Sequence, residues 1–157
     1  MNARTIAVTA IAAALLAVGG YLMLVQGSAP DAVGNVQLRP DDPDLVAEGR
    51  SIYDANCASC HGRDLEGEAD WRSRDADGML PAPPHDETGH TWHHPDKVLF
   101  AITKYGPSKL SDGQYESRMP GYDDILTDRE IIAALSYIKS TWPADIRRRH
   151  DRMQADQ

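Results

Sequence analysis

The two cysteines of this 157-residue chain, Cys57 and Cys60, stand three positions apart, and His61 follows them directly. Two thiols are too few for the framework of several disulfides that stabilises many small exported domains. They are also too few for an all-cysteine zinc or iron–sulfur site within one chain. The pair therefore acts together, and whatever it binds constrains the fold.

Residues 57–61 match the pattern C-x-x-C-H, which is typical of covalent haem attachment. Two thiols on one helical turn can reach the two vinyl groups along one edge of a porphyrin, and the next residue then lies beneath the iron. The pattern predicts one haem c, bound covalently through Cys57 and Cys60. A disulfide, a thioredoxin-like redox pair and half of a zinc site are the alternatives. A redox pair is expected after a strand, and zinc needs two further ligands.

Apolar residues at helical spacing predict three helices and no pair of strands, so the fold class is all-α. The first helix has about 14 residues and starts at Pro43, after an Asp42 cap. The second covers residues 95–105, before a Gly-Pro pair. The third follows a capping box at Thr127 and ends at Trp142, before a proline.

Two long segments between these helices, 62–91 and 108–124, carry no periodic apolar pattern and are predicted to be loops. Loops of this length inside a small domain are usually functional or organised around something that they bind. Three modest helices enclose little apolar volume, because a domain of about 100 residues buries a limited fraction of its surface. A covalently bound haem would supply the missing core.

The amino-terminal residues 5–25 carry no charge and follow Arg4. As a helix, this stretch would be about 31 Å long, enough for a hydrocarbon core of about 30 Å. We therefore predict a transmembrane helix with its amino terminus in the cytoplasm. A cleaved signal peptide is the alternative.

The predicted organisation has four parts. Residues 1–29 form a membrane anchor or uncleaved signal, 30–41 a linker, 42–143 the haem domain, and 144–157 a basic tail. This order predicts a single-pass protein of a bacterial inner membrane whose haem domain lies in the periplasm.

These features together resemble the monohaem class I cytochrome c family, in its membrane-anchored bacterial form. The resemblance rests on Gly49 and Tyr53, on residues 57–62 and 118–122, and on the predicted closing helix at 126–142. It implies a small cytochrome c fold, with three main helices around one haem. In that family the first and last helices pack against each other through a small residue and aromatic side chains.

For this chain the resemblance implies that Gly49 and Tyr53 face Tyr137 or Trp142. It also implies that the iron is held by the histidine of the motif on one side and by a methionine before the last helix on the other. The first expected axial ligand is therefore His61. A backbone carbonyl within residues 80–84 is expected to accept a hydrogen bond from its ring.

The second expected axial ligand is Met119. Its position also supports this role independently, because a distal ligand must lie in a loop well after His61 and just before the closing helix. Met79 is the competing methionine, but it lies close to His61 in a proline-rich stretch.

Four histidines fall in one short stretch, at positions 85, 90, 93 and 94. They are expected to cap the second helix and to line the edge of the haem. Two alternatives are a second metal site, since histidine with nearby carboxylates suits copper or zinc, and replacement of Met119 by one of these rings.

The formal net charge of −8, from 16 basic and 24 acidic residues, excludes a basic nucleic-acid-binding protein. With His61 and Met119 both on the iron, no substrate can bind there, so we expect a one-electron carrier and not an enzyme. Thioether ligation raises the haem potential, which suits a respiratory chain. The expected partners are membrane-bound or periplasmic redox proteins. The alternatives are a haem c subunit of a larger oxidase or dehydrogenase complex, and a ligand-binding haem enzyme or sensor with a displaceable Met119.

Overall fold

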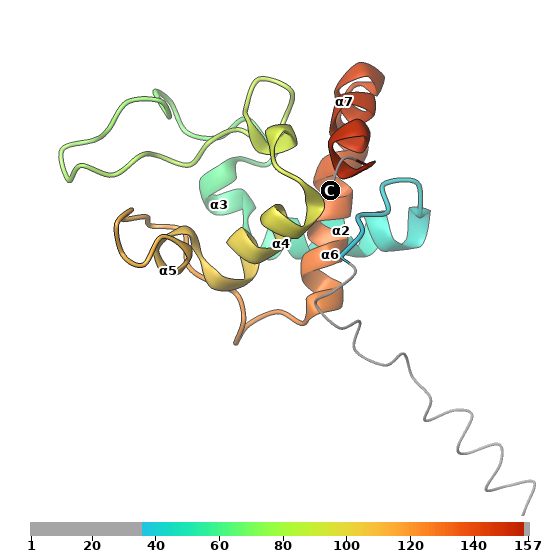
Figure 1. The fold of residues 1–157 in the computed structure, drawn as a ribbon, viewed down its shortest axis with the longest axis horizontal. Helices are drawn as coiled ribbons and strands as arrows, with labels where there is room; N and C mark the ends of the chain where they lie inside the picture. Colours follow the sequence, from blue (N-terminus) through green and yellow to red (C-terminus); the bar gives the residue numbers. More distant parts are fainter. Residues whose placement is uncertain (1–35, 156–157) are drawn as a thin grey trace, which may run out of the picture. The chain divides into compact units, whose positions relative to one another are not determined.

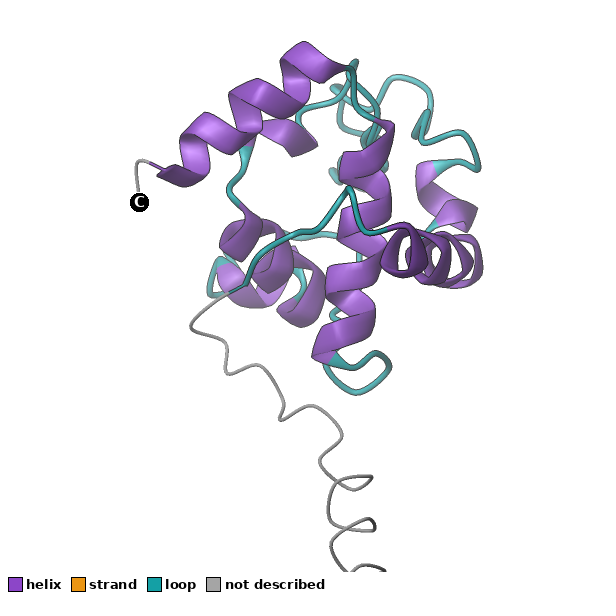
Figure 2. Cartoon of the chain, turned by 90° about the vertical axis from the view of Figure 1, so that its right-hand side faces the viewer, coloured by secondary structure: helices purple, strands orange, loops and turns teal. Residues whose placement is uncertain are grey.

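The computed structural model describes residues 36–155, which form a helical domain (Figure 1, Figure 2). No strand occurs in this part of the chain, so the predicted all-α fold class is confirmed. The helices, in chain order, are α2 (Pro43–Asn56), α3 (Ala58–His61), the 3-10 helix η1 (Thr91–His93), α4 (Asp96–Tyr105), α5 (Pro107–Leu110), α6 (Asp128–Thr141) and α7 (Ala144–Ala155).

The predicted membrane anchor at residues 1–29 lies outside the described residues. Between residues 36 and 155, no helix combines the length and the apolar character that crossing a bilayer requires.

Helix α2 has the predicted start and length. The side chain of Asp42 accepts a hydrogen bond from the Leu45 N–H at 3.1 Å, and Pro43 occupies the first turn. Proline suits that position because the amide it lacks would have no partner inside the helix. The buried face consists of Leu45, Gly49 and Tyr53, and the helix ends immediately before Cys57.

The second and third predicted helices are α4 and α6. Helix α4 begins at Asp96, with Pro95 as its cap. At the start of α6, the Thr127 hydroxyl accepts the Glu130 N–H at 3.3 Å, and the Glu130 carboxylate accepts the Thr127 N–H at 2.8 Å. The Thr127 N–H and hydroxyl both donate to this carboxylate and favour its ionised form, so the pKa of Glu130 lies below its ordinary value. The predicted capping box is therefore present.

Helices α2 and α6 cross with their backbones in close contact at Gly49. A Cβ atom on this residue would lie 2.0 Å from the carbonyl oxygen of Ala133 in α6. Next to the crossing, the rings of Tyr53 and Tyr137 lie 5.5 Å apart, centroid to centroid. Of the two aromatic partners that the resemblance allowed for Tyr53, the structure therefore has Tyr137. Trp142 instead donates its indole N–H to the carbonyl of His85, at 2.7 Å.

The segment after Pro143 forms helix α7, for which the sequence had no apolar stripe and which we predicted only as a basic extension. It is attached through two buried residues, Ile146 and His150. His150 Nε2 lies 3.0 Å from the carbonyl oxygen of His94, so α7 contacts the loop next to η1. Arg147 adds an ion pair with Asp41 at 2.7 Å.

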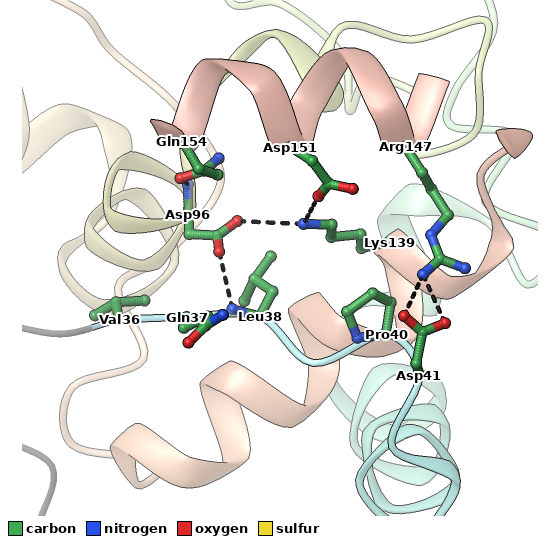
Figure 3. Close-up of a pocket in the computed structure, with 10 residues that line it drawn as sticks. All are labelled: Val36, Gln37, Leu38, Pro40, Asp41, Asp96, Lys139, Arg147, Asp151 and Gln154. Atoms are coloured by element: carbon green, nitrogen blue, oxygen red, sulfur yellow. Dashed lines mark hydrogen bonds and ion pairs between the residues drawn. The ribbon is translucent and has the colours of Figure 1, made fainter. Parts of the chain in front are cut away.

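A polar cluster ties α7 to the rest of the domain around a cavity of about 490 Å³ (Figure 3). Asp96 and Lys139 are 3% and 4% exposed, which is rare for charged residues and requires compensation. Lys139 Nζ lies 2.7 Å from Asp151 and 4.0 Å from Asp96 Oδ1. The other oxygen of Asp96 accepts the Leu38 N–H at 2.9 Å. Asp96 therefore joins α4, α6 and the segment before α2.

His150 completes this cluster, with Nε2 3.5 Å from Asp96 Oδ1. Its pKa is lowered, first by burial and then by the charge of Lys139, against the opposing effect of Asp96. Because the folded state favours the neutral ring, unfolding takes up a proton below about pH 6.5, the ordinary histidine pKa. The stability that depends on neutral His150 is thus complete above that pH and is lost as the pH falls.

We therefore expect the His150→Gln variant, measured by urea unfolding between pH 5 and 7, to lose less stability on acidification than the wild type. The glutamine amide can still donate to the carbonyl of His94 but has no proton to take up. Equal slopes of unfolding free energy against pH in the two proteins would contradict this assignment.

Candidate haem site

A cavity of about 400 Å³ contains all four of the residues that the sequence nominated: Cys57, Cys60, His61 and Met119. Its walls come from the junction of α2 and α3, the loop 62–91, helix α4, the segment 115–122 and helix α6. The remaining lining is mostly apolar and includes Leu80, Leu99, Ile102, Ala134, Leu135 and Ile138.

The two cysteines lie on either side of a single helical turn. Cys57 closes α2, with its N–H bonded to the carbonyl of Tyr53 at 2.8 Å. The N–H groups of Cys60 and His61 both bond back to the carbonyl of Cys57, at 3.1 and 3.0 Å. This turn directs the three side chains of the motif to the same cavity.

The thiol of Cys57 has its pKa raised to about 11, first by burial and then by the neighbouring Cys60. A reactive redox cysteine instead has a lowered pKa, because the thiolate is the nucleophile. Cys57 and Cys60 are not joined in a disulfide. The environment of Cys57 is therefore that of a thiol in an apolar pocket and not that of a thioredoxin-like pair.

His61 is buried, and its ring is fixed by the loop 62–91. Its Nδ1 lies 2.8 Å from the carbonyl oxygen of Pro83, so the expected bond to a carbonyl within residues 80–84 is confirmed. This bond places the proton on Nδ1 and leaves Nε2 as the free nitrogen. Burial lowers the pKa of His61, against the opposing effect of the Pro83 carbonyl, and this favours the neutral ring that can act as a ligand. His85 stacks on the same ring at 4.0 Å.

Met119 lies in a segment that Tyr122, three residues later, ties to two helices. Tyr122 donates its N–H to the carbonyl of Lys104 at 2.9 Å, which ties the segment to α4. The hydroxyl of Tyr122 donates to the carbonyl of Asn56 at 2.7 Å, which ties it to the end of α2. Among the methionines of residues 36–155, Met119 lines the cavity and Met79 does not.

The backbone comes unusually close where this segment passes α4. Gly106 has a φ of +80°, and a Cβ on it would lie 2.9 Å from the Gly121 nitrogen. Sequence reasoning identified Gly106 only as the end of a helix. Its second role, admitting the backbone of the methionine segment, has no local sequence signature.

Of the four clustered histidines, three line the cavity and one does not. His85, His90 and His94 line the cavity, whereas His93 packs against the ring of Trp92 at 3.8 Å. Within the described residues, no three side chains of His, Cys, Asp or Glu converge as a metal-binding set. The alternative of a second metal site therefore gains no geometric support there.

The donor set and the surroundings fit a haem c. Two thiols, one buried imidazole and one thioether share a cavity that is otherwise mostly apolar, which suits a large flat hydrophobic group with an iron at its centre.

A family model described as "Cytochrome c" matches residues 46–142, more than half of the chain. The chain belongs to the cytochrome c family. Its cofactor is therefore a covalently bound haem c, and Cys57 and Cys60 have the spacing of the attachment motif. A cytochrome c domain is a haem-based electron carrier, and the described helices have the corresponding all-α fold.

Two curated relatives are subunits of larger assemblies. The chain is 26% identical over 132 residues to the Cbb3-type cytochrome c oxidase subunit FixP of Sinorhizobium medicae. The matched region covers 83% of this chain and 41% of FixP. It is 43% identical over 70 residues to the cytochrome bc1 complex cytochrome c subunit of Corynebacterium diphtheriae, covering 43% of this chain and 24% of that subunit. The chain thus spans less than half of the length of either relative.

A solved structure supports the fold. The crystal structure of cytochrome CL from Methylophaga aminisulfidivorans superposes with a TM-score of 0.51 at 23% identity, covering 83% of each chain. This likeness confirms the cytochrome c fold.

Proposed function

We propose that this protein carries one electron at a time on a single haem c, attached by Cys57 and Cys60 and ligated by His61 and Met119. The bound iron supplies the redox chemistry by alternating between its ferric and ferrous states. The observation that most supports this ligand pair is that His61 and Met119, from segments far apart in the sequence, line the same cavity as the two thiols.

The chain's own part in electron transfer is to keep both ligands in place in either oxidation state. The Pro83 carbonyl holds the proton on His61 Nδ1 and fixes the plane of the ring. Tyr122 holds the methionine segment against α2 and α4. Little then has to rearrange when the charge changes by one.

The same arrangement favours a carrier over an enzyme. Because His61 and Met119 would fill both axial positions, a peroxide or a diatomic gas finds no vacant site on the iron.

The proposed cellular setting follows the amino-acid sequence. Residues 1–29 would anchor the chain in a bacterial inner membrane, 30–41 would serve as a linker, and 42–143 would form the haem domain in the periplasm. Residues 144–157 would form a basic tail. Its partners would be membrane-bound or periplasmic redox proteins.

A second candidate function is that of an electron-carrying subunit in a membrane complex. It is supported by the two relatives whose names place them in oxidase and bc1 complexes. Purification of the full chain in mild detergent distinguishes the two. A subunit will co-purify with other redox proteins in fixed ratio, and a separate carrier will not.

The ligand pair is tested with the full chain, produced in cells that attach haem c and purified in detergent. We expect Met119→Ala to keep its covalent haem but to lose the far-red sulfur-to-iron band of the ferric protein. Its ferrous form should bind carbon monoxide, and its midpoint potential should fall by roughly 0.1 V or more, within the span of about 0.8 V that axial ligands control.

Met79→Ala is the matched control, because Met79 is the competing methionine and lies outside the cavity lining. It should keep the far-red band and the potential of the wild type. A band that survives in Met119→Ala, or a wild-type ferrous protein that binds carbon monoxide readily, would contradict the proposed ligation and favour a ligand-binding haem protein.

A further inference from the structure

Arg118 bridges the methionine segment and the long loop 62–91. One of its guanidinium nitrogens donates to Asp75, and the other donates to Asp77 Oδ2 at 2.8 Å. Arg118 directly precedes Met119, whereas the two aspartates lie 43 and 41 positions earlier in the chain. The loop and the segment after α5 extend on the same side of the molecule (Figure 1).

The turn that carries the two aspartates is organised by hydrogen bonds of its own. Asp75 Oδ1 accepts the N–H groups of Asp77 and Met79, at 2.9 and 3.0 Å. The Asp75 N–H donates to the carbonyl of Met79 at 2.9 Å, and Gly78 provides the positive φ of +80° that this turn requires. The second oxygen of Asp75 is thereby fixed as the acceptor for Arg118.

The charge states suit a lasting bridge. The hydrogen bond from Arg118 is the largest cause that lowers the pKa of Asp75, and backbone N–H groups act in the same direction. Asp75 is therefore ionised at any pH at which the protein is expected to work, and Arg118 is always charged.

The base of the loop is fixed as well. The Glu68 N–H donates to the carbonyl of Ala82 at 2.8 Å, and the Ala82 N–H donates to Glu68 Oε2 at 2.6 Å. Residues 80–83 and residues 117–120 both line the haem cavity. The bridge from Arg118 therefore joins two segments that bound this cavity.

We propose that Arg118 is a positioning residue that, with Asp75 and Asp77, holds the methionine segment against the long loop and so limits how readily Met119 leaves the iron. This inference rests on the proposed His61/Met119 ligation. It gives the long loop a specific task, which is to hold the distal ligand in place. An incoming ligand would reach the iron only after Met119 moves away, and movement of the segment that carries Met119 away from the long loop would strain or break the bridge.

The test is the rate at which external imidazole binds to the ferric full-chain protein, followed by stopped-flow loss of the far-red band at saturating imidazole. The rate then reports the departure of Met119. Half-exposed ion pairs each change an equilibrium by about 1.5- to 5-fold, so Arg118→Gln should bind imidazole about three- to tenfold faster than the wild type. Asp77→Asn should produce a smaller increase. Arg118→Lys should fall between, because an ammonium keeps the charge but lacks the planar fork that reaches both carboxylates.

Arg129→Gln is the matched control. Like Arg118, Arg129 is an exposed arginine, but it makes one ion pair, with Glu48 at 2.7 Å, and it does not line the cavity. It should bind imidazole at the wild-type rate. At about 1 M salt, where the screening length is about 3 Å, the wild-type rate should rise toward that of Arg118→Gln.

The outcomes separate this inference from the proposed function. If the wild type shows the far-red band and Arg118→Gln binds imidazole no faster than Arg129→Gln, the positioning role is wrong and the ligation stands. If the wild type has no such band, or Met119→Ala keeps it, the ligation itself is wrong. Faster binding in Arg118→Gln, with partial rescue by lysine, supports the bridge.

Discussion

Replacing Gly49 with alanine should lower the free energy of unfolding by about 3 kcal/mol, near the upper end for overpacked sites. The new Cβ would lie 2.0 Å from the carbonyl oxygen of Ala133 and 2.4 Å from its carbonyl carbon. Both are backbone atoms of α6, so no side chain can rotate away, and the two helices have to separate. The loss should appear in thermal unfolding followed by circular dichroism, as a fall in Tm of roughly 10 °C or more.

The sign of this effect makes it diagnostic. In an ordinary helix interior, alanine is more stable than glycine by roughly 1 kcal/mol. Ser51→Ala is the matched control, because Ser51 is an exposed residue of the same helix, and its substitution should change stability by no more than about 0.5 kcal/mol. A Gly49→Ala protein as stable as the wild type would show that α2 and α6 do not cross at this point.

Sequence reasoning predicted the elements whose signals are local. Asp42 with Pro43, and Thr127 with Glu130, are short-range caps, and they place the starts of α2 and α6 correctly. Helix α7 was missed because few of its residues are buried and these include both an apolar and a polar side chain. Only Ile146 and His150 are buried along it, so no apolar stripe marks it as a helix.

In the candidate site too, features with a local sequence signal were predictable, and features that depend on the conformation of a long loop were not. The attachment motif is contiguous, and the place of Met119 in the chain predicts that it lies at the same site; both groups do line one cavity. The acceptor for His61 was predicted only to within residues 80–84, since any carbonyl there has the same chemistry and the conformation of the loop selects Pro83. The bridge from Arg118 has no sequence signature, because it depends on how a loop more than 40 residues away is folded.

Replacing Lys139 with methionine should lower the free energy of unfolding by about 3 kcal/mol, the size expected when one member of a buried ion pair is removed. Lys139 and Asp96 are almost fully buried. Without the ammonium, Asp96 keeps only the Leu38 N–H and the ring of His150, whose lowered pKa leaves it neutral near pH 7. Urea unfolding measures the loss. Lys97→Met, at an exposed lysine, is the control and should change stability by no more than about 0.5 kcal/mol.

A double-mutant cycle then shows whether the cost comes from the uncompensated charge or from lost packing. Asp96→Asn removes the buried charge while keeping an oxygen that can accept the Leu38 N–H. If charge is the cause, the variant carrying both Lys139→Met and Asp96→Asn should be more stable than the sum of the single losses predicts, by about 1–3 kcal/mol. Additive losses would instead assign the effect to packing. Because α4 and α6 both line the haem cavity, whereas Asp96 and Lys139 do not, a coupled loss would also mean that a cluster outside the cavity lining stabilises two of the cavity walls.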